Sequence, residues 1–411
     1  MTDAGKTTAY KSAGVDIDAQ ERGLARVKEL ARATFTPGVL TEIGSFGGLF
    51  RPELAGMREP VLVASADGVG TKLMVARLAG DYSTVGRDLV NHCVNDILVQ
   101  GALPLFFLDY LGAGALEPER MVELVRGVAD GCRQNGCALL GGETAEMPGF
   151  YQPGDYELVG FIVGLVDRPH VLDGSRVVAG SVLVGLPSAG LHTNGFSLAR
   201  RILFEQLRLG IDDQAPWARE LRVGEALLAP HLSYLAPLTP LLRHPAMRAL
   251  AHVTGGGLTD NLPRVLSPGL HAEVRVGSWE VPEIFHFLQE QGGVETEEMF
   301  RVFNMGLGMV LVVDPAGLRE VLGELRRSGQ RSSVIGTVQE GGSGVVYDLG
   351  PLPGAAQPGL DPDPAPPAAE TSADGSGPVS LGVPLGEGPK SPAPAVSAPR
   401  PKGRRGKLTH D

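Results

Sequence analysis

The sequence has few cysteines, an excess of negative charge and no long apolar run. Its three cysteines, Cys93, Cys132 and Cys137, include no CxxC pair, so neither a disulfide framework nor a cysteine-based zinc site is indicated, and we expect reduced, packed side chains. The formal net charge of −11 argues against broad nucleic-acid binding by the globular part, because neutralising phosphates requires clustered lysine and arginine. An anionic small molecule would need a metal ion, glycine loops and a few local cations.

No apolar run reaches the roughly 18 to 20 residues that cross a bilayer, and residues 1–14 lack the charged-then-apolar pattern of a secretory signal. We therefore expect a cytoplasmic protein. At 411 residues, 43% of them hydrophobic, the chain can bury a large core, and its length fits two domains better than one. Its 57 glycines are about twice the usual share of ~7%, and outside the C-terminal region they gather in short runs that favour tight turns near a ligand.

Apolar runs that suit strands alternate along the chain with segments of helical periodicity, which predicts a mixed α/β protein. In the first half the predicted strands are residues 60–66, 104–111, 137–144 and 155–166, and the predicted helices are residues 17–34, 73–78, 85–100 and 118–135. In the second half the predicted strands are residues 182–186, 272–276, 308–313 and 333–338, and the predicted helices are residues 196–209 and 223–243.

The predicted domain boundary lies near residue 172, where the pattern weakens into polar residues, so the two domains are residues 1–172 and 173–349. Residues 350–411 are dominated by proline, alanine, glycine and serine, a composition that predicts a disordered tail. The tail ends in a basic stretch, residues 400–407, that could touch RNA, membrane or an acidic partner, although a solvated tail is the favoured interpretation.

A glycine loop, Asp67-Gly-Val-Gly-Thr-Lys72, joins a predicted strand to a predicted helix. Gly68 and Gly70 let the backbone approach phosphate oxygens, Asp67 can hold magnesium, and Lys72 can offset negative charge. The spacing is not that of a Walker A loop, and a plain strand-to-helix turn is the alternative.

Two more carboxylates have comparable settings. Asp96 lies on the otherwise apolar helix predicted over residues 85–100, and Glu143 follows a predicted strand. With Asp67 they could converge on metal ions bound to a nucleotide, because magnesium prefers oxygen ligands and takes one or two protein carboxylates together with phosphates and water. Helix capping for Asp96 and a surface loop for Glu143 are the alternatives.

Two loops in the second half carry groups that suit substrate recognition. Residues 188–195, Ser-Ala-Gly-Leu-His-Thr-Asn-Gly, place hydroxyl, imidazole and amide groups between a strand and a helix. His192, with an unperturbed pKa near 6.5, could exchange a proton or hydrogen-bond a polar substrate, although a lone histidine is more often structural. Residues 252–257, His-Val-Thr-Gly-Gly-Gly, expose backbone N–H groups at a helix start, which suits a phosphate monoester and equally a tight turn.

In order, spacing and extent these motifs resemble the AIR synthetase family over nearly the whole globular chain. The segments that carry the resemblance are residues 10–18, 67–72, 94–97, 100–101, 106–110, 141–149, 188–195, 252–257 and 303–306. Single glycine motifs are weak evidence, whereas this ordered series is specific. A related superfamily contains selenophosphate synthetase, thiamine-monophosphate kinase and a hydrogenase-maturation enzyme, but the reactive cysteine or selenocysteine expected of the first is missing here.

The resemblance implies a homodimer whose subunits each have two α/β domains, with the N-terminal domains joined through a sheet or barrel at the interface and ATP in a cleft. The implied reaction converts formylglycinamidine ribonucleotide and ATP to 5-aminoimidazole ribonucleotide, ADP and phosphate, in purine biosynthesis. The γ-phosphoryl would go to the formyl amide oxygen, and the amidine nitrogen would attack that carbon before phosphate leaves. No membrane partner is implied.

The resemblance also implies roles for individual residues. The implied catalytic residues are His192, Asn194 and Lys72, and the implied ligands of Mg2+ are Asp67, Asp96 and Glu143. The ATP site would be formed by Asp67, Gly68, Gly70, Thr71, Lys72, Asp96 and Glu143, together with Asp16 and Lys28 from a segment that closes over the nucleotide. The substrate would be held by Ser188, His192, Thr193, Asn194, His252, Gly255, Gly256 and Gly257, the last three at the ribose phosphate. A requirement for K+ stays open.

Two other functions are compatible with the sequence. A small-molecule kinase of the same superfamily would leave phosphate on its product, whereas a cyclo-ligase releases it. A catalytically silent ATP-binding scaffold would use the tail to recruit partners, but the intact acidic positions and His192 argue against it. The tail from about residue 350 has no counterpart in the family pattern, so its role stays open.

Overall fold

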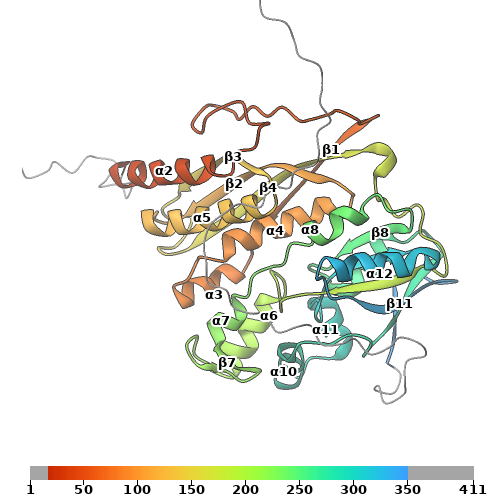
Figure 1. Cartoon of the computed structure of the whole chain (residues 1–411). Coiled ribbons are helices and arrows are strands. Elements are labelled where there is room, and N and C mark those ends of the chain that lie inside the picture. The colour runs from red at the N-terminus through yellow and green to blue at the C-terminus, as the bar shows by residue number, and fades with distance from the viewer. Residues whose placement is uncertain (1–16, 350–411) are drawn as a thin grey trace, which may run out of the picture. The chain divides into compact units, whose positions relative to one another are not determined.

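The computed structural model describes residues 17–349, which belong to one compact unit built around two main β-sheets (Figure 1). Asp16 and the predicted tail, residues 350–411, lie outside the described residues. No helix between residues 17 and 349 is long and apolar enough to cross a membrane. The mixed α/β class predicted from the sequence is confirmed.

The first sheet has four strands, in the order β1 (Pro60–Gly68), β4 (Tyr156–Asp167), β2 (Leu103–Ala113) and β3 (Ala138–Glu146). β4 is antiparallel to β1 and to β2, whereas β2 and β3 are parallel and are connected through helix α5 (Pro118–Gln134). Within residues 17–349 of a single chain this sheet is open and forms no closed barrel.

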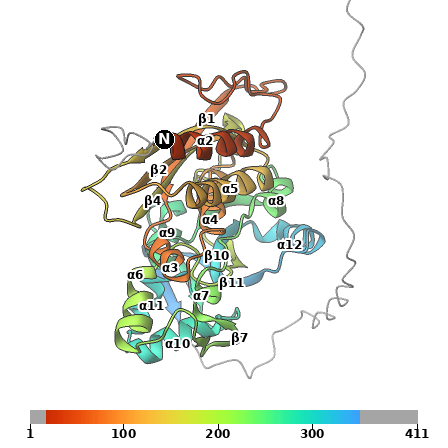
Figure 2. The ribbon, with the colours of Figure 1, turned by 90° about the vertical axis from the view of Figure 1, so that its left-hand side faces the viewer.

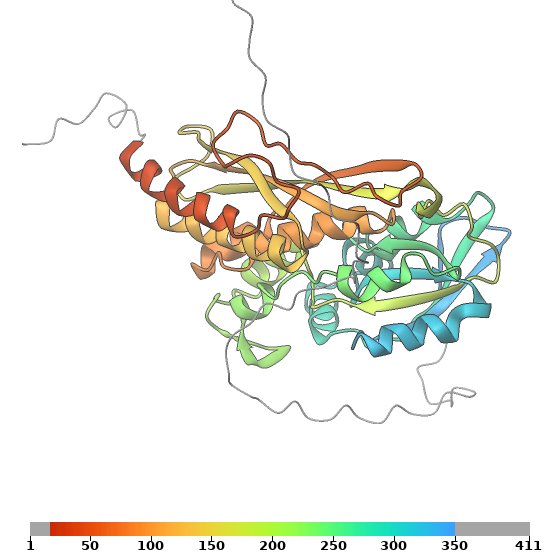
Figure 3. The same cartoon turned by 45° about the horizontal axis from the view of Figure 1, so that its top comes forward.

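Helices cover one face of the first sheet but not the other, open face, where Phe50 of the segment before β1 contacts Phe106 of β2 (Figure 3). α4 (Val85–Leu98) packs on β1 and β4, α5 packs on α4, and α2 (Ile17–Arg32) packs on α5. β1 alternates between exposed and half-buried residues, the period-2 pattern of a strand with one face toward helices. Leu62, Leu103 and Phe161 share this open face by strand register and are exposed.

The second sheet has six strands, in the order β12 (Val345–Asp348), β9 (Leu270–Arg275), β11 (Ser333–Glu340), β5 (Val182–Pro187), β10 (Leu307–Val313) and β8 (Met247–His252). Its centre is covered on both faces. Val310 and Val312 of β10 pack in one hydrophobic cluster, whereas Met309 and Leu311 pack in another that includes helix α12 (Leu318–Arg327). Because successive strand residues point to opposite faces, β10 is buried along its whole length.

Shorter elements lie between these. The shorter α-helices are α3 (Lys72–Ala79), α6 (Phe196–Arg200), α7 (Val223–Leu227), α8 (Leu235–Leu238), α9 (Gly257–Asn261), α10 (Glu283–Gly292) and α11 (Thr296–Val302). A π-helical segment, Arg201–Gln206, continues α6, and short 3₁₀ helices lie at Arg168–His170, Thr239–Leu241, Leu262–Val265 and Pro315–Gly317. A two-stranded ribbon is formed by β6 (Gln214–Ala215) and β7 (Ala218–Arg222). The first sheet ends at residue 167 and the second begins at residue 182, so the boundary near residue 172 lies between them and stays a prediction.

The long helix predicted over residues 223–243 is wrong. α7 ends at Leu227 and α8 spans only Leu235–Leu238, with an irregular segment at residues 228–234 between them. Pro230 has no backbone N–H and disfavours helical backbone at Ala229, so the chain leaves the helix there. The sequence pattern also did not predict β8 or β12.

Candidate active site

α4 carries a polar stripe on an otherwise buried apolar helix. Asp88, Asn91, His92, Asn95 and Asp96 recur at spacings of three to four residues, which places them on one side of the helix. α4 also contacts α8 of the second half, and Figure 2 shows it running between the two sheets. The stripe therefore faces the junction between the two halves of the chain.

The stripe binds the irregular segment at residues 228–234. The Asp88 carboxylate accepts from the backbone N–H of His231 at 2.6 Å, and the Asn91 amide donates to the His231 carbonyl at 2.8 Å. Asn95 donates to the Leu232 carbonyl at 2.8 Å and accepts from the Tyr234 N–H at 3.0 Å. Because these bonds satisfy backbone groups that would be unpaired outside a helix, they hold His231 in the site.

His92 joins the glycine loop, residues 67–72, to the loop at residues 188–195, called the recognition loop from here on. Its Nε2 lies 2.8 Å from the Asp67 carboxylate, and its Nδ1 lies 2.8 Å from the Thr193 hydroxyl. A second contact, 3.2 Å between the hydroxyls of Thr71 and Ser197, links the glycine loop to α6, the helix that directly follows the recognition loop. The loops at residues 67–72 and 188–195, which the sequence suggested separately, therefore meet.

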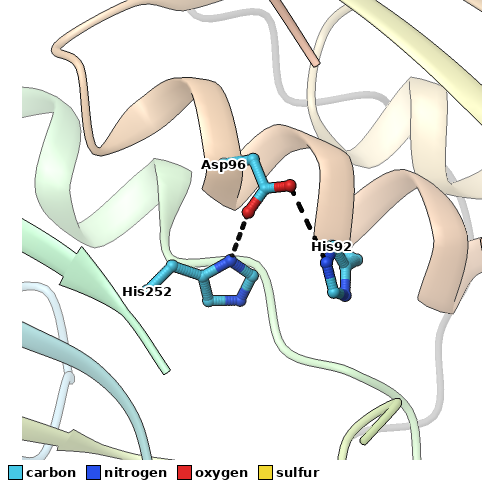
Figure 4. Close-up of side chains that lie close together, drawn as sticks. All are labelled: His92, Asp96 and His252. Atoms are coloured by element: carbon cyan, nitrogen blue, oxygen red, sulfur yellow. Dashed lines mark hydrogen bonds and ion pairs between the residues drawn. The ribbon is translucent and has the colours of Figure 1, made fainter. Parts of the chain in front are cut away.

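Asp96 and His252 lie beside His92, as Figure 4 shows. Asp96 Oδ1 lies 2.8 Å from His252 Nδ1, and Asp96 Oδ2 lies 3.7 Å from His92 Nε2 and accepts from the Ser65 hydroxyl at 3.1 Å. His92, Asp96 and His252 each offer one ligand atom, and these three atoms lie within 4.8 Å of one another. The triangle is a candidate metal site.

Four imidazoles pack together here, those of His92, His192, His231 and His252. All four are buried, and the rings of His192 and His231 stack with their centroids 4.0 Å apart. Burial lowers the pKa of His252, and it lowers the pKa values of His192 and His231 well below their usual range, because a charged imidazole loses its hydration. Burial opposes charging of His92 as well, but its hydrogen bond to Asp67 and the nearby charge of Asp96 raise its pKa overall.

His192 has an unusual backbone and an unpaired nitrogen. Its φ of 59° is in the left-handed region. Its Nε2 accepts from the Ala189 N–H at 3.1 Å and faces the Leu232 N–H at 3.5 Å, so the ring proton belongs on Nδ1. Among the described residues Nδ1 is buried and has no hydrogen-bond partner. His192 is thus a neutral imidazole whose Nδ1 donor is buried and unpaired among the described residues.

Lys72 lies away from the open part of the glycine loop. Its ammonium contacts Asp88 at 2.6 Å, with both side chains fully buried, and donates to the Ala229 carbonyl at 2.8 Å. Lys72 therefore ties α3 to α4 and to the irregular segment, and its assignment to the nucleotide stays a prediction. The loop itself is open, because Gly70 has a φ of 64° and no atom within 4 Å of where a Cβ would stand.

Glu143 does not join Asp67 and Asp96 within one chain. It lies on β3, which is separated from β1 by β4 and β2, a displacement of roughly 14 Å at the usual strand spacing. Its exposed carboxylate accepts from the Thr144 N–H at 3.0 Å. Lys28, on α2, lies beside the turn at Gly44. The metal role of Glu143 and the nucleotide role of Lys28 stay predictions.

The remaining predicted substrate residues gather around the recognition loop. The Asn194 amide oxygen lies 3.3 Å from where a Cβ on Gly255 would stand, so the turn at residues 255–257 is adjacent to that loop. Gly256 and Gly257 have φ values of 97° and 56°, which glycine adopts without strain. Ser188 donates to the Gly190 carbonyl at 2.9 Å or the Asn304 side chain at 3.0 Å, so it holds the loop in shape.

Sequence reasoning missed His92 and His231. His92 lies one turn before Asp96 on the same side of α4, and this spacing was a usable signal. His231 was hidden because its segment was predicted to be helical.

Two family models match the chain. The N-terminal domain of the AIR synthase related protein family matches residues 54–166, and the C-terminal domain of that family matches residues 178–348. Together these ranges contain both main sheets.

The chain is also similar to proteins of known name. It is 51% identical over 330 residues to the phosphoribosylformylglycinamidine cyclo-ligase of Trichlorobacter lovleyi, covering 80% of this chain and 94% of that protein. It is 49% identical over 339 residues to the enzyme of the same name from Geobacillus kaustophilus, covering 82% of this chain and 97% of that protein.

Two solved structures share the fold at low sequence identity. The thiamine-monophosphate kinase of Stenotrophomonas maltophilia has a TM-score of 0.56 at 18% identity, covering 81% of this chain and 96% of that one. A hydrogenase maturation protein in complex with ATP has a TM-score of 0.57 at 17% identity, covering 80% of this chain and 89% of that one. With both family models matched, and with relatives about half identical along most of their length, this chain belongs to the AIR synthase family of phosphoribosylformylglycinamidine cyclo-ligases.

Proposed function

We propose that this chain closes the imidazole ring of formylglycinamidine ribonucleotide at the expense of ATP, giving 5-aminoimidazole ribonucleotide, ADP and phosphate. The observation that carries the proposal is the bridge from Asp67 through His92 to Thr193, with both distances at 2.8 Å. A loop suited to phosphates and a loop suited to a polar substrate therefore share one site, as phosphoryl transfer between two bound molecules requires.

The nucleotide would lie at the glycine loop. Asp67, Gly68, Gly70 and Thr71 leave the loop open and able to approach phosphate oxygens. Asp67 and Asp96 both lie near His92, and two carboxylates together with phosphates and water fit the coordination of Mg2+. Bound there, Mg2+ would neutralise negative charge on the phosphates.

The reacting end of the substrate would lie at residues 188–195 and 252–257. The formyl amide oxygen of the substrate is a poor leaving group. Transfer of the γ-phosphoryl group to this oxygen turns it into a good one, and it leaves as phosphate after the amidine nitrogen attacks the same carbon and closes the ring. His192 contributes as a neutral hydrogen-bond donor through Nδ1, because its Nε2 is engaged by backbone N–H groups. The glycines at residues 255–257 would hold the ribose phosphate, next to Asn194.

A second copy of the chain would cover the open face of the first sheet, and the enzyme would work as a cytoplasmic homodimer. Leu62, Leu103 and Phe161 expose 64%, 42% and 46% of their surface on that face. Large apolar side chains gathered on one face are typical of subunit interfaces. The mass of the purified protein in solution tests this part of the proposal, and a monomer would contradict it.

The activity is tested with ATP, Mg2+ and formylglycinamidine ribonucleotide, by following released phosphate and the diazo colour of the aminoimidazole. Wild type should form both products together, and only when the substrate is present. The variant His192→Asn, which tolerates a left-handed backbone, should lose both, while His286→Asn at an exposed position should not. Phosphate retained on an organic product would instead identify a kinase.

A further inference from the structure

The described residues contain a closed ring of polar contacts around the histidines. His92 Nδ1 lies 2.8 Å from the Thr193 hydroxyl, which lies 3.3 Å from His231 Nδ1. His231 Nε2 lies 3.2 Å from His252 Nε2, and His252 Nδ1 lies 2.8 Å from Asp96. The ring closes where Asp96 faces His92 Nε2 at 3.7 Å.

Asn95 decides where the protons of this ring belong. Its amide orientation is fixed because Oδ1 accepts from the Tyr234 N–H and Nδ2 donates to the Leu232 carbonyl. The same Nδ2 group lies 3.2 Å from His231 Nε2 and can only donate, so His231 Nε2 is an acceptor.

This assignment determines the tautomer of His252. Since His231 Nε2 is an acceptor, its neighbour His252 Nε2 must carry a proton. In a neutral imidazole the other nitrogen, His252 Nδ1, then has a lone pair, and that lone pair points at the Asp96 carboxylate 2.8 Å away. Two acceptors this close need a cation between them, which is either a proton that charges His252 or a metal ion.

The surrounding atoms suit a metal cation. Without a metal, His92 Nε2 donates to Asp67 at 2.8 Å. When a metal ion replaces that proton, His92 can donate from Nδ1 to the Thr193 hydroxyl, and the lone pair of Nε2 then faces Asp67 and Asp96. His231 contacts the second nitrogen of His252. Metal-bound histidines usually have such a partner on the second nitrogen. Metal–ligand bonds of 2.0–2.1 Å at tetrahedral angles put ligand atoms about 3.3 Å apart. Here the contacts are 2.8 Å from His252 to Asp96 Oδ1 and 3.7 Å from His92 to Asp96 Oδ2, and the three ligand atoms lie within 4.8 Å of one another (Figure 4), so a metal ion would draw them together by about an ångström or less.

We propose that His92, Asp96 and His252 bind one transition-metal dication, such as Zn2+, directly and without a nucleotide, leaving a fourth position open toward Asp67. Two imidazoles and one carboxylate are the ligand set of zinc-type sites, whereas Mg2+ prefers oxygen ligands alone. The site shares Asp96 with the proposed Mg2+–nucleotide site, but it rests on side-chain geometry and not on the proposed reaction.

The test is equilibrium binding to the purified full chain, freed of metal and without nucleotide. Zn2+ should bind at one ion per chain, a large excess of Mg2+ should not displace it, and Co2+ at the same site should show the visible absorption of a low-coordinate nitrogen and oxygen site. Stoichiometric binding that is weakened in His92→Asn and His252→Gln supports the proposal. Absence of binding, or easy displacement by Mg2+, would overturn it and leave a proton between His252 and Asp96.

The variants are chosen to remove a ligand and keep its support. In His92→Asn the side-chain amide can keep the contact that Nδ1 makes with Thr193, and only the ligand nitrogen Nε2 is lost. In His252→Gln the amide can keep the contact that Nε2 makes with His231, and only the ligand nitrogen Nδ1 is lost. Thr193→Val should weaken Zn2+ binding ~10–100-fold, as loss of a ligand's support does, and the two histidine variants should weaken it more. The control His286→Asn should bind as wild type does.

Two results keep the metal site separate from the proposed reaction. If the chain forms aminoimidazole with Mg2+ but binds no Zn2+, the metal inference fails and the proposed function stands. If it binds Zn2+ but forms no aminoimidazole, the metal inference stands and the proposed function fails. Circular dichroism and thermal unfolding of each variant identify any that do not fold. If the histidine variants do not fold, the Zn2+ affinity of Thr193→Val tests the metal site instead.

Discussion

The histidine cluster and the glycine loop, two regions of one site, are built in opposite ways. Around His231 nearly every polar group is buried and bound, and side chains of α4 satisfy the backbone of the segment at residues 228–234. At Gly70 the backbone has the left-handed conformation that favours glycine and faces open space. The first region is organised before any ligand binds, whereas the second is left for a ligand to complete.

The largest expected effect comes from the buried ion pair that supports the organised region. Lys72→Met should destabilise the protein by ~3–5 kcal/mol, because it leaves the Asp88 carboxylate buried without its partner. The double variant Lys72→Met with Asp88→Asn should recover most of this loss, since the amide oxygen can still accept from His231. Denaturant unfolding measures both.

An exposed ion pair gives the matched comparison. Arg26 and Glu119, whose side chains are 48% and 81% exposed, should contribute less than ~1 kcal/mol when Arg26→Met is measured in the same way. Equal losses from Lys72→Met and Arg26→Met would mean that the junction is not the organised region described here.

The next effect is on catalysis. His192→Asn should lower kcat by ~10²–10³ and leave the KM for ATP within a few-fold, because it removes a donor at the reacting end and not at the glycine loop. Steady-state rates of aminoimidazole formation provide the measurement. If only the KM for ATP rises in the variant, His192 contacts the nucleotide and not the reacting end of the substrate.

A smaller effect concerns pH. His192, His231 and His252 have lowered pKa values, so below about pH 6.5 the unfolded chain binds more protons than the folded one and stability falls as pH falls. His92 acts in the opposite sense: its raised pKa stabilises the fold below about pH 6.5, and this contribution is lost as pH rises through the folded value.

Three histidines outweigh one, so unfolding free energies measured at pH 7.5, 6.0 and 5.0 should decrease. Each histidine that stays neutral contributes roughly 1.4 kcal/mol per pH unit below its unfolded pKa. In His192→Asn the free energy of unfolding should change less steeply with pH, by the roughly 1.4 kcal/mol per pH unit that one neutral histidine contributes. An unchanged slope would show that His192 takes up protons in the folded state as freely as in the unfolded one.

The smallest effect concerns the open loop. Gly70 and Gly80 have φ values of 64° and 65°, and neither has an atom within 4 Å of where a Cβ would stand, so Gly70→Ala and Gly80→Ala should each cost about 1 kcal/mol of stability. Only Gly70→Ala should also raise the KM for ATP, because Gly80 ends α3 outside the loop. A matching rise in both variants would remove the glycine loop from the nucleotide site.

Much of this arrangement could be predicted from local patterns. Apolar runs located the strands of the first sheet, helical periodicity located α4, and the ordered motifs identified the loops at residues 67–72 and 188–195. These features depend on a few neighbouring residues, which a single sequence displays directly.

What could not be predicted depends on contacts between distant residues. The separation of Glu143 from Asp67 follows from the strand order β1-β4-β2-β3, which no local pattern states. The pairing of Lys72 with Asp88 depends on how α3 packs against α4. His231 was missed because residues 223–243 have the apolar periodicity of a helix, although Pro230 was a usable signal against one.

The central claim, that the two loops form one site through His92, is tested most directly by a double-mutant cycle on kcat/KM for aminoimidazole formation. The cycle pairs Asp67→Asn with Thr193→Val, the two side chains that contact opposite nitrogens of His92. The account predicts that the combined loss differs from the sum of the single losses by more than ~0.5 kcal/mol. Losses that add within that margin would contradict it and make the two loops independent.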